Sequence, residues 1–184
     1  TVKHEWVPLP LEQHRLVVID SRVKRKLASG EYNKRRQECQ EAVKLLKPKY
    51  PRVAALRDLE EKDLTAALPL LPDLPRKRAE HVVRENARVK AAVAALRAGD
   101  HAAFGQLLNR SHDSLRDLYQ VSCPELDLLV GTAQKVPGVL GARMMGGGFG
   151  GCAIALVETG AIEGLTRDVP RAYQHRFGTT PPVT

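Results

Sequence analysis

Glycine is concentrated in one short stretch of the sequence, where residues 144–152 read MMGGGFGGC. Five of the chain's 14 glycines fall within residues 146–151. A run of this kind lets backbone approach a ligand closely, and its N–H groups can form an anion-binding nest. The structural alternative is a tight hairpin or bulge that tucks Phe149 into the core. A plain hairpin needs only one or two glycines, so the sequence leaves both interpretations open.

The residues around the run exclude two common nucleotide-binding motifs. No Gly-Lys-Ser/Thr follows the glycines, so the stretch is not a Walker A loop. The spacing also lacks GxGxxG between a strand and a helix, which the dinucleotide fingerprint requires. The segment that follows, CAIALVE, is itself strand-like. The glycines alone therefore do not predict a complete nucleotide site.

Other side chains whose types could take part in catalysis or metal binding lack the partners that a site needs. His81 and His112 each fall in an amphipathic stretch without a partnered cysteine or carboxylate pattern, so we interpret both as structural histidines. The cysteines at 39, 123 and 152 show no metal-ligand spacing, which indicates free thiols in a reducing cytoplasm. No metal site is expected in this chain.

Two adjacent arginines, Arg35 and Arg36, could bind phosphate. Both fall on a predicted helix that also carries glutamates within about one turn, namely Glu31, Glu38 and Glu41. We therefore expect them to be surface charges in salt bridges.

Length and composition indicate one globular domain. The chain has 184 residues, of which 43% are hydrophobic and 27% charged, and no apolar run approaches the ~18–20 residues that cross a membrane. The net charge of +8 would attract phosphorylated molecules. Aromatic residues make up only 4% and offer little to stack on bases, so nucleic acid is not expected as a partner. Because the chain lacks an initiator methionine, we expect it to be a fragment of a longer protein.

Apolar patterning predicts an α+β chain with an antiparallel sheet covered by helices. Predicted strands cover 15–20, 142–145 and 152–158, and the last residues lead into another extended segment. Predicted helices cover 21–47, 76–98, 101–119, 122–136 and 160–178, with short helices between Pro51 and Pro75. Asp100 is predicted to cap one helix, and Ser122 to form a capping box with Glu125 at another.

Several segments in order resemble the galactokinase family of the GHMP small-molecule kinases. The stretch GARMMGGGFGGCAIALVE is similar to the third motif of that family, and SGEYNKRRQECQEAV to a second signature. Residues 78–96, 104–130 and 137–152 resemble further galactokinase segments at the family's spacing. The resemblance covers nearly the whole chain. It implies the ferredoxin-like C-terminal domain of the family, with added helices, over residues 1–184.

The resemblance implies ATP-dependent phosphorylation of the anomeric hydroxyl of galactose, which gives galactose 1-phosphate and ADP. In the family, the N-terminal domain carries the sugar signature, the phosphate-cradling loop and the catalytic aspartate. None of these is found here, so no catalytic residue is assigned in this chain. ATP and Mg²⁺ are expected to bind mainly to the missing N-terminal half, and the chain alone is expected to be inactive.

The resemblance also implies roles for individual residues. Tyr32 falls where the family uses a tyrosine to contact the sugar. Lys24 falls where the family commonly has a basic residue near the transferring phosphate, although Arg22 and Arg25 replace the more usual Asn and His beside it. The loop glycines, Gly146, Gly147, Gly148, Gly150 and Gly151, match the third motif, which lies beside the phosphate loop. Phe149 is expected to be a packing residue.

Three other functions remain open at this point. A galactose-and-ATP sensor would keep the fold without catalysis, and a kinase for N-acetylgalactosamine or arabinose would share most of these motifs. A basic nucleic-acid binder would show tight, steeply salt-dependent binding.

Overall fold

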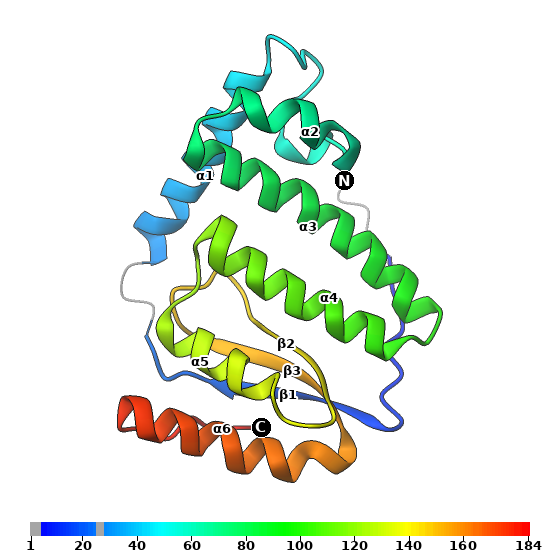
Figure 1. Cartoon of the computed structure of the whole chain (residues 1–184), viewed down its shortest axis with the longest axis vertical. Coiled ribbons are helices and arrows are strands. Elements are labelled where there is room, and N and C mark those ends of the chain that lie inside the picture. The colour runs from blue at the N-terminus through cyan, green and yellow to red at the C-terminus, as the bar shows by residue number, and fades with distance from the viewer. Residues whose placement is uncertain (1–4, 25–27) are drawn as a thin grey trace.

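The computed structural model describes residues 5–24 and 28–184, and its core is a three-stranded antiparallel sheet (Figure 1). The strands are β1 (His14–Asp20), β2 (Val139–Met144) and β3 (Cys152–Glu158), in the spatial order β1-β3-β2. β1 pairs with β3 in register from His14 opposite Glu158 to Asp20 opposite Cys152. The pairing of β2 with β3 contains a register shift between Val139 and Gly141.

The C-terminal residues extend this sheet beyond β1. Val18 and Thr184 exchange backbone hydrogen bonds of 2.7 and 2.9 Å, and the N–H of Asp20 donates to the carbonyl of Pro182. The spatial order is therefore C-terminal segment, β1, β3, β2. Together with the intervening helices, this arrangement is the βαββαβ pattern of a ferredoxin-like fold, which confirms the predicted fold class.

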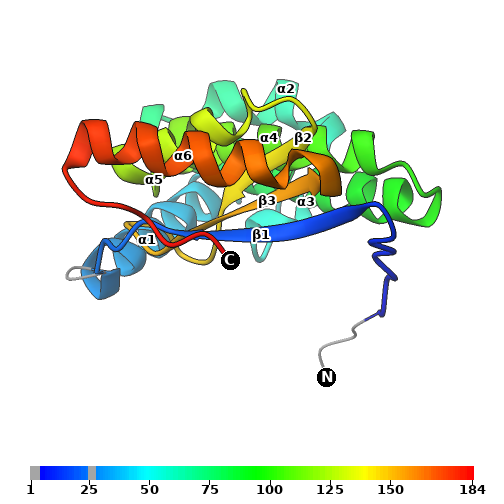
Figure 2. The ribbon, with the colours of Figure 1, turned by 90° about the horizontal axis from the view of Figure 1, so that it is seen from below.

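The described part of the chain also contains six α-helices and several short turns. The longer helices are α1 (Ala28–Leu46), α3 (Asp73–Arg97), α4 (His101–Ser114), α5 (Pro124–Ala133) and α6 (Ile162–Phe177). Between α1 and α3 lie the 3-10 turns Leu56–Asp58, Glu61–Asp63 and Leu68–Leu70, together with α2 (Leu64–Ala67). Figure 2 shows α4, α5 and α6 on one face of the sheet. Within the described part of the chain, no helix is long and apolar enough to cross a membrane.

Two large hydrophobic clusters hold the molecule together, and a small one joins them. The first packs α5 and α6 on the sheet, with Ile19, Leu129 and Tyr173 among its buried members. The second packs α1 and α3 around the short turns. The small cluster consists of Leu115, Val121, Leu126 and Met144, with Tyr119, Cys123 and Phe149 packed against it. The loop between β2 and β3 attaches to the protein at this junction.

The backbones of α4 and β2 touch where two glycines face each other. A Cβ atom on Gly141 would lie 1.9 Å from the carbonyl oxygen of Gly105, and one on Gly105 would lie 2.3 Å from that of Leu140. Real side chains do not approach backbone so closely, so only glycine lets the helix lie this near to the strand.

One predicted helix cap is confirmed and one is wrong. The side chain of Asp100 accepts a hydrogen bond of 2.8 Å from Ala103 N and caps α4. The N-cap of α5, however, is Cys123, because Pro124 takes the first helical position. Ser122 therefore lies outside the helix, and its hydroxyl donates to Oδ1 of Asp127 at 2.5 Å.

Candidate functional site

The glycine loop, residues 145–151, connects β2 to β3 and uses glycine for two physical reasons. Four of its glycines have φ between 68° and 118°, a region that side chains rarely adopt: Gly146, Gly148, Gly150 and Gly151. Two also lie against backbone, since a Cβ on Gly148 would be 2.0 Å from Val121 O and one on Gly150 would be 2.6 Å from Val23 O. Gly147 has open space around it. The loop is thus a tightly docked hairpin that is open at Gly147.

Phe149 anchors the loop to the small hydrophobic cluster, which confirms the prediction that it is a packing residue. Its ring packs beside Leu115, Leu126 and Met144. Its N–H donates to the carbonyl of Val121 at 2.8 Å, and its φ of 59° is left-handed although it is not glycine. Such a conformation persists only where surrounding contacts hold it.

The segment after β1 runs beside the same loop. Ser21 N donates to Gly151 O at 2.9 Å, and Gly151 N donates to Val23 O at 3.2 Å. These bonds place Lys24, which is exposed, next to the loop. Arg25 lies outside the described residues.

Tyr32 lies in the first turns of α1, and its side chain is 58% exposed. Arg35, one turn later on the same helix, places its guanidinium carbon 5.8 Å from the centroid of the Phe149 ring. The start of α1, the end of β1 and the loop between β2 and β3 lie on one side of the molecule (Figure 1). The structure therefore gathers Tyr32, Lys24 and the glycine loop at one end of the sheet.

The prediction that Arg35 is a surface charge is wrong. Its side chain is buried, and its Nε and Nη2 donate to the carbonyl oxygens of Tyr119 and Gln120 at 2.8 and 2.9 Å. The expected salt bridges to Glu31 and Glu38 are present but long, at 3.5 Å each. The neighbouring Arg36 is exposed, in line with the sequence interpretation.

The carbonyl acceptors come from a π-helical turn, η4 (Leu115–Tyr119), which follows α4 and ends at Gln120 in the left-handed region. The last carbonyls of a helix lack partners within it. Arg78 of α3 meets two groups there, the carbonyl of Leu118 and Oε1 of Gln120 (2.9 Å), and its Nε lies 2.6 Å from Glu38. Only 1% of Arg78 is exposed, and sequence reasoning missed it because arginine on an amphipathic helix is usually solvated.

Both histidines are buried in structural positions, but the expectation that both are fully hydrogen-bonded fails for His112, whose Nε2 has no hydrogen-bond partner among the described residues. His81 Nδ1 lies 2.8 Å from Ser114 Oγ and its ring stacks on Tyr119, while burial lowers its pKa to about 4. His112 Nδ1 accepts from Met144 N at 3.3 Å, and burial also lowers the pKa of His112. His112 Nε2 lies 3.4 Å from Asp127, a contact that becomes an ion pair only when the ring is protonated. Both rings are therefore neutral near pH 7.

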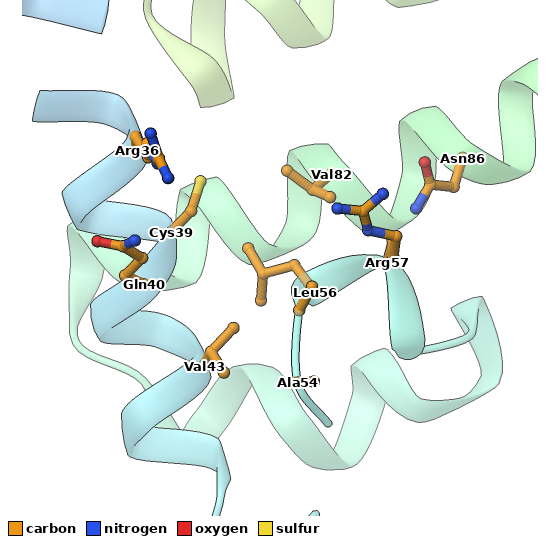
Figure 3. A pocket seen from close by; sticks show the side chains of 10 residues that line it. Arg36, Cys39, Gln40, Val43, Ala54, Leu56, Arg57, Val82 and Asn86 are labelled. Atoms are coloured by element: carbon orange, nitrogen blue, oxygen red, sulfur yellow. The ribbon is translucent and has the colours of Figure 1, made fainter. Parts of the chain in front are cut away.

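The described residues at this end of the sheet include no cluster of metal-ligating side chains. Among residues 5–24 and 28–184, no three or more His, Cys, Asp or Glu side chains come together as a metal would require. A cavity of about 530 Å³ opens elsewhere, between α1, Ala54–Arg57 and α3 (Figure 3). It includes Arg36 and Cys39, but neither Tyr32 nor the glycine loop.

Comparisons with known proteins agree with the fold. The family described as GHMP kinases C terminal matches residues 92–175. Galactokinase from Roseiflexus sp. (strain RS-1) is 50% identical over 174 residues, which are 95% of this chain and 44% of that protein. Galactokinase from Thermotoga neapolitana is 46% identical over 177 residues, 96% of this chain and 48% of that protein. The chain spans about half the length of these relatives.

Solved structures give the same result. Lactococcus lactis galactokinase complexed with galactose superposes with a TM-score of 0.95 at 40% identity, covering 100% of this chain and 47% of that one. L. major mevalonate kinase shares the fold, with a TM-score of 0.61 at 22% identity. The match covers 96% of this chain and 43% of that one. Residues 92–175 therefore match the C-terminal region of the GHMP kinases, and the whole chain is similar in sequence and fold to about half of a galactokinase.

Proposed function

We propose that this chain is the C-terminal half of an ATP-dependent galactokinase, which phosphorylates the anomeric hydroxyl of galactose to give galactose 1-phosphate and ADP. The observation that carries the proposal is the superposition on a galactokinase complexed with galactose over the whole length of this chain. The N-terminal half of the same protein is the main partner, and it holds most of the contacts to ATP and Mg²⁺. We propose a cytoplasmic enzyme that uses neither nucleic acid nor a membrane.

In this proposal, Tyr32 contacts the sugar. Its exposed phenol can exchange hydrogen bonds with a sugar hydroxyl, while the ring supplies apolar surface. The helix that carries it is fixed by Arg35, so the hydroxyl is presented from a rigid element. The role of this residue is to bind and orient galactose rather than to move a proton.

The phosphate side of the site is formed by Lys24 and the glycine loop. A cation at Lys24 would offset negative charge on the transferring phosphoryl group. Gly146 and Gly147 are exposed, and the open space at Gly147 leaves room for backbone or phosphate from the other half to approach closely. The catalytic base belongs to the N-terminal half, so this chain closes and aligns the site.

The first test replaces Tyr32 by phenylalanine in the full-length enzyme. Loss of one neutral hydrogen bond of about 1 kcal/mol should raise the galactose KM about fivefold, with little change in the ATP KM. Tyr50→Phe is the matched control, because Tyr50 packs against the α1/α3 cluster away from the site. Steady-state kinetics with galactose, N-acetylgalactosamine and arabinose measure the effect. An unchanged galactose KM would contradict the role of Tyr32, and faster turnover of another sugar would favour that specificity.

The second test asks whether the two halves are needed together. The 184-residue chain alone should show no ATP-dependent phosphorylation of galactose, whereas the full-length protein should turn over galactose. Measurable turnover by the chain alone would contradict the division of labour. Galactose and ATP binding by the full-length protein without turnover would instead identify a sensor.

A further inference from the structure

A closed set of contacts joins the helix of Tyr32 to the glycine loop. The guanidinium of Arg35 lies over the ring of Phe149, and its N–H groups bind the carbonyls of Tyr119 and Gln120. The next carbonyl along the chain, that of Val121, accepts the N–H of Phe149. The path therefore runs from α1 through three consecutive carbonyl groups to the loop, and returns to α1 through the aromatic ring.

The carbonyl segment in the middle of this path, residues 118–121, is also bound by a second buried arginine. Arg78 of α3 binds the carbonyl of Leu118 and the side chain of Gln120, so this segment is fixed on two sides. Glu38 lies between the arginines, 2.6 Å from Arg78 Nε and 3.5 Å from Arg35 Nη1, and balances part of their charge. Buried charges with satisfied hydrogen bonds specify one geometry.

Arginine suits this position for a geometric reason. Its planar guanidinium can donate in plane to two carbonyls while one of its faces stacks on an aromatic ring. Lysine keeps the charge but lacks the plane and the fork of N–H groups. Gly148 has no room for a side chain against Val121 O, so the loop cannot shift toward this segment to compensate.

We propose that Arg35 is a positioning residue that sets the glycine loop relative to Tyr32, so that the sugar side and the phosphate side of the site keep one alignment. Arg35 acts through Phe149 and the carbonyl segment and does not itself touch a substrate. The identity of the two ligand sides rests on the proposed function, whereas the control of the loop by Arg35 does not.

The first experiment measures amide hydrogen exchange in the full-length protein. Arg35→Met should raise exchange in residues 146–151 about tenfold or more, while β3 and α6 keep their protection. Arg35→Lys should give a smaller rise, because the charge remains. Arg36→Met is the matched control, since Arg36 is exposed one position away, and it should leave the loop unchanged. Unaltered loop exchange in both Arg35 variants would overturn the proposal, and so would an equal rise across all helices.

The second experiment is a double-mutant cycle of Arg35→Met and Phe149→Leu, read in kcat and in the KM for galactose and for ATP. If Arg35 acts through the ring, the double variant should be impaired about as much as Arg35→Met alone. Partial recovery of kcat in Arg35→Lys would support positioning over simple loss of stability. Strictly additive losses would overturn the proposal. If the enzyme proves to have no galactokinase activity, the exchange experiment still decides the role of Arg35, so the two failures remain distinguishable.

Discussion

Glycine is required for different physical reasons near the two ends of β2. Close to the start of the strand, Gly141 faces Gly105 of α4, and neither has a positive φ; they are glycine because no Cβ would fit. Beyond the end, Gly148 and Gly150 need left-handed dihedrals as well as space. The first contact is a buried seam between helix and sheet, while the second belongs to a loop at the candidate site. The two isolated glycines therefore serve packing, whereas the clustered glycines allow the backbone of the loop to adopt left-handed dihedrals.

The largest expected effect is at the seam. Gly141→Ala brings a methyl group against backbone, which cannot move aside as a flexible side chain can, so the free energy of unfolding should fall by about 3 kcal/mol. Urea denaturation followed by circular dichroism measures the loss. Gly131→Ala on α5 is the control, because nothing lies within 4 Å of its Cβ position, and it should stabilise the helix by up to about 1 kcal/mol. A loss below that of an ordinary surface substitution would show that the seam can open at little cost.

An intermediate effect is expected in the loop, where two neighbours can be compared. Gly148→Ala combines a left-handed φ with a clash against Val121 O, and should reduce the free energy of unfolding by about 2 kcal/mol. Gly147→Ala meets open space without a positive φ and should change it by less than about 0.5 kcal/mol. Steady-state kinetics of the full-length protein carrying each substitution would extend the comparison from stability to substrate binding. A rise in the ATP KM of Gly147→Ala at unchanged stability would indicate that this open position faces the phosphates.

The smallest expected effect is a pH-dependent weakening of one backbone hydrogen bond of β2. It should occur at Met144, near the loop, and not at Ala142. Ala142 N donates to Oδ1 of Asn109, which does not titrate, whereas Met144 N donates to His112 Nδ1. Burial lowers the pKa of His112 below its ordinary 6.5, with Asp127 acting against that shift and Arg116 adding to it. The stability gained from the neutral ring is thus complete above pH 6.5 and declines as pH falls through 6.5 toward the lower pKa of the folded state.

Hydrogen exchange, corrected for the intrinsic pH dependence of the amides, provides the measurement. Between about pH 7.5 and 5.5, protection of the Met144 amide should decrease less than about tenfold, and that of Ala142 should stay constant. His112→Gln should remove the difference, because glutamine does not titrate in this range. Equal loss at both amides would mean that acid loosens the whole strand rather than its loop end.

The sequence predicts the elements of this fold better than the contacts between them. Compact apolar runs located β1 and β3, helical apolar spacing located the long helices, and the glycine cluster pointed to the loop. The seam was missed because an isolated glycine in a helix or strand is common. Arg35 and Arg78 were misjudged or missed because their partners are backbone carbonyls of residues 118–120, whose orientation depends on a π-helical turn. Local spacing pointed to nearby glutamates and carried no signal for acceptors some 40 to 85 positions away.

Within the described residues, the three non-glycine positions with left-handed φ are Arg22, Gln120 and Phe149. Arg22 adjoins Val23, whose carbonyl accepts a hydrogen bond from Gly151 of the loop. Gln120 accepts from Arg35 through its carbonyl and from Arg78 through its side chain. Phe149 anchors the loop. Each such residue costs on the order of 1 kcal/mol or more in a folded protein. Glycine at Gln120 or Phe149 would relieve this backbone strain, but it would also remove the side chain that binds Arg78 or the ring that anchors the loop. The strain at these positions is therefore expected to persist in stabilised variants, because the side chains that cause it also hold the loop in place.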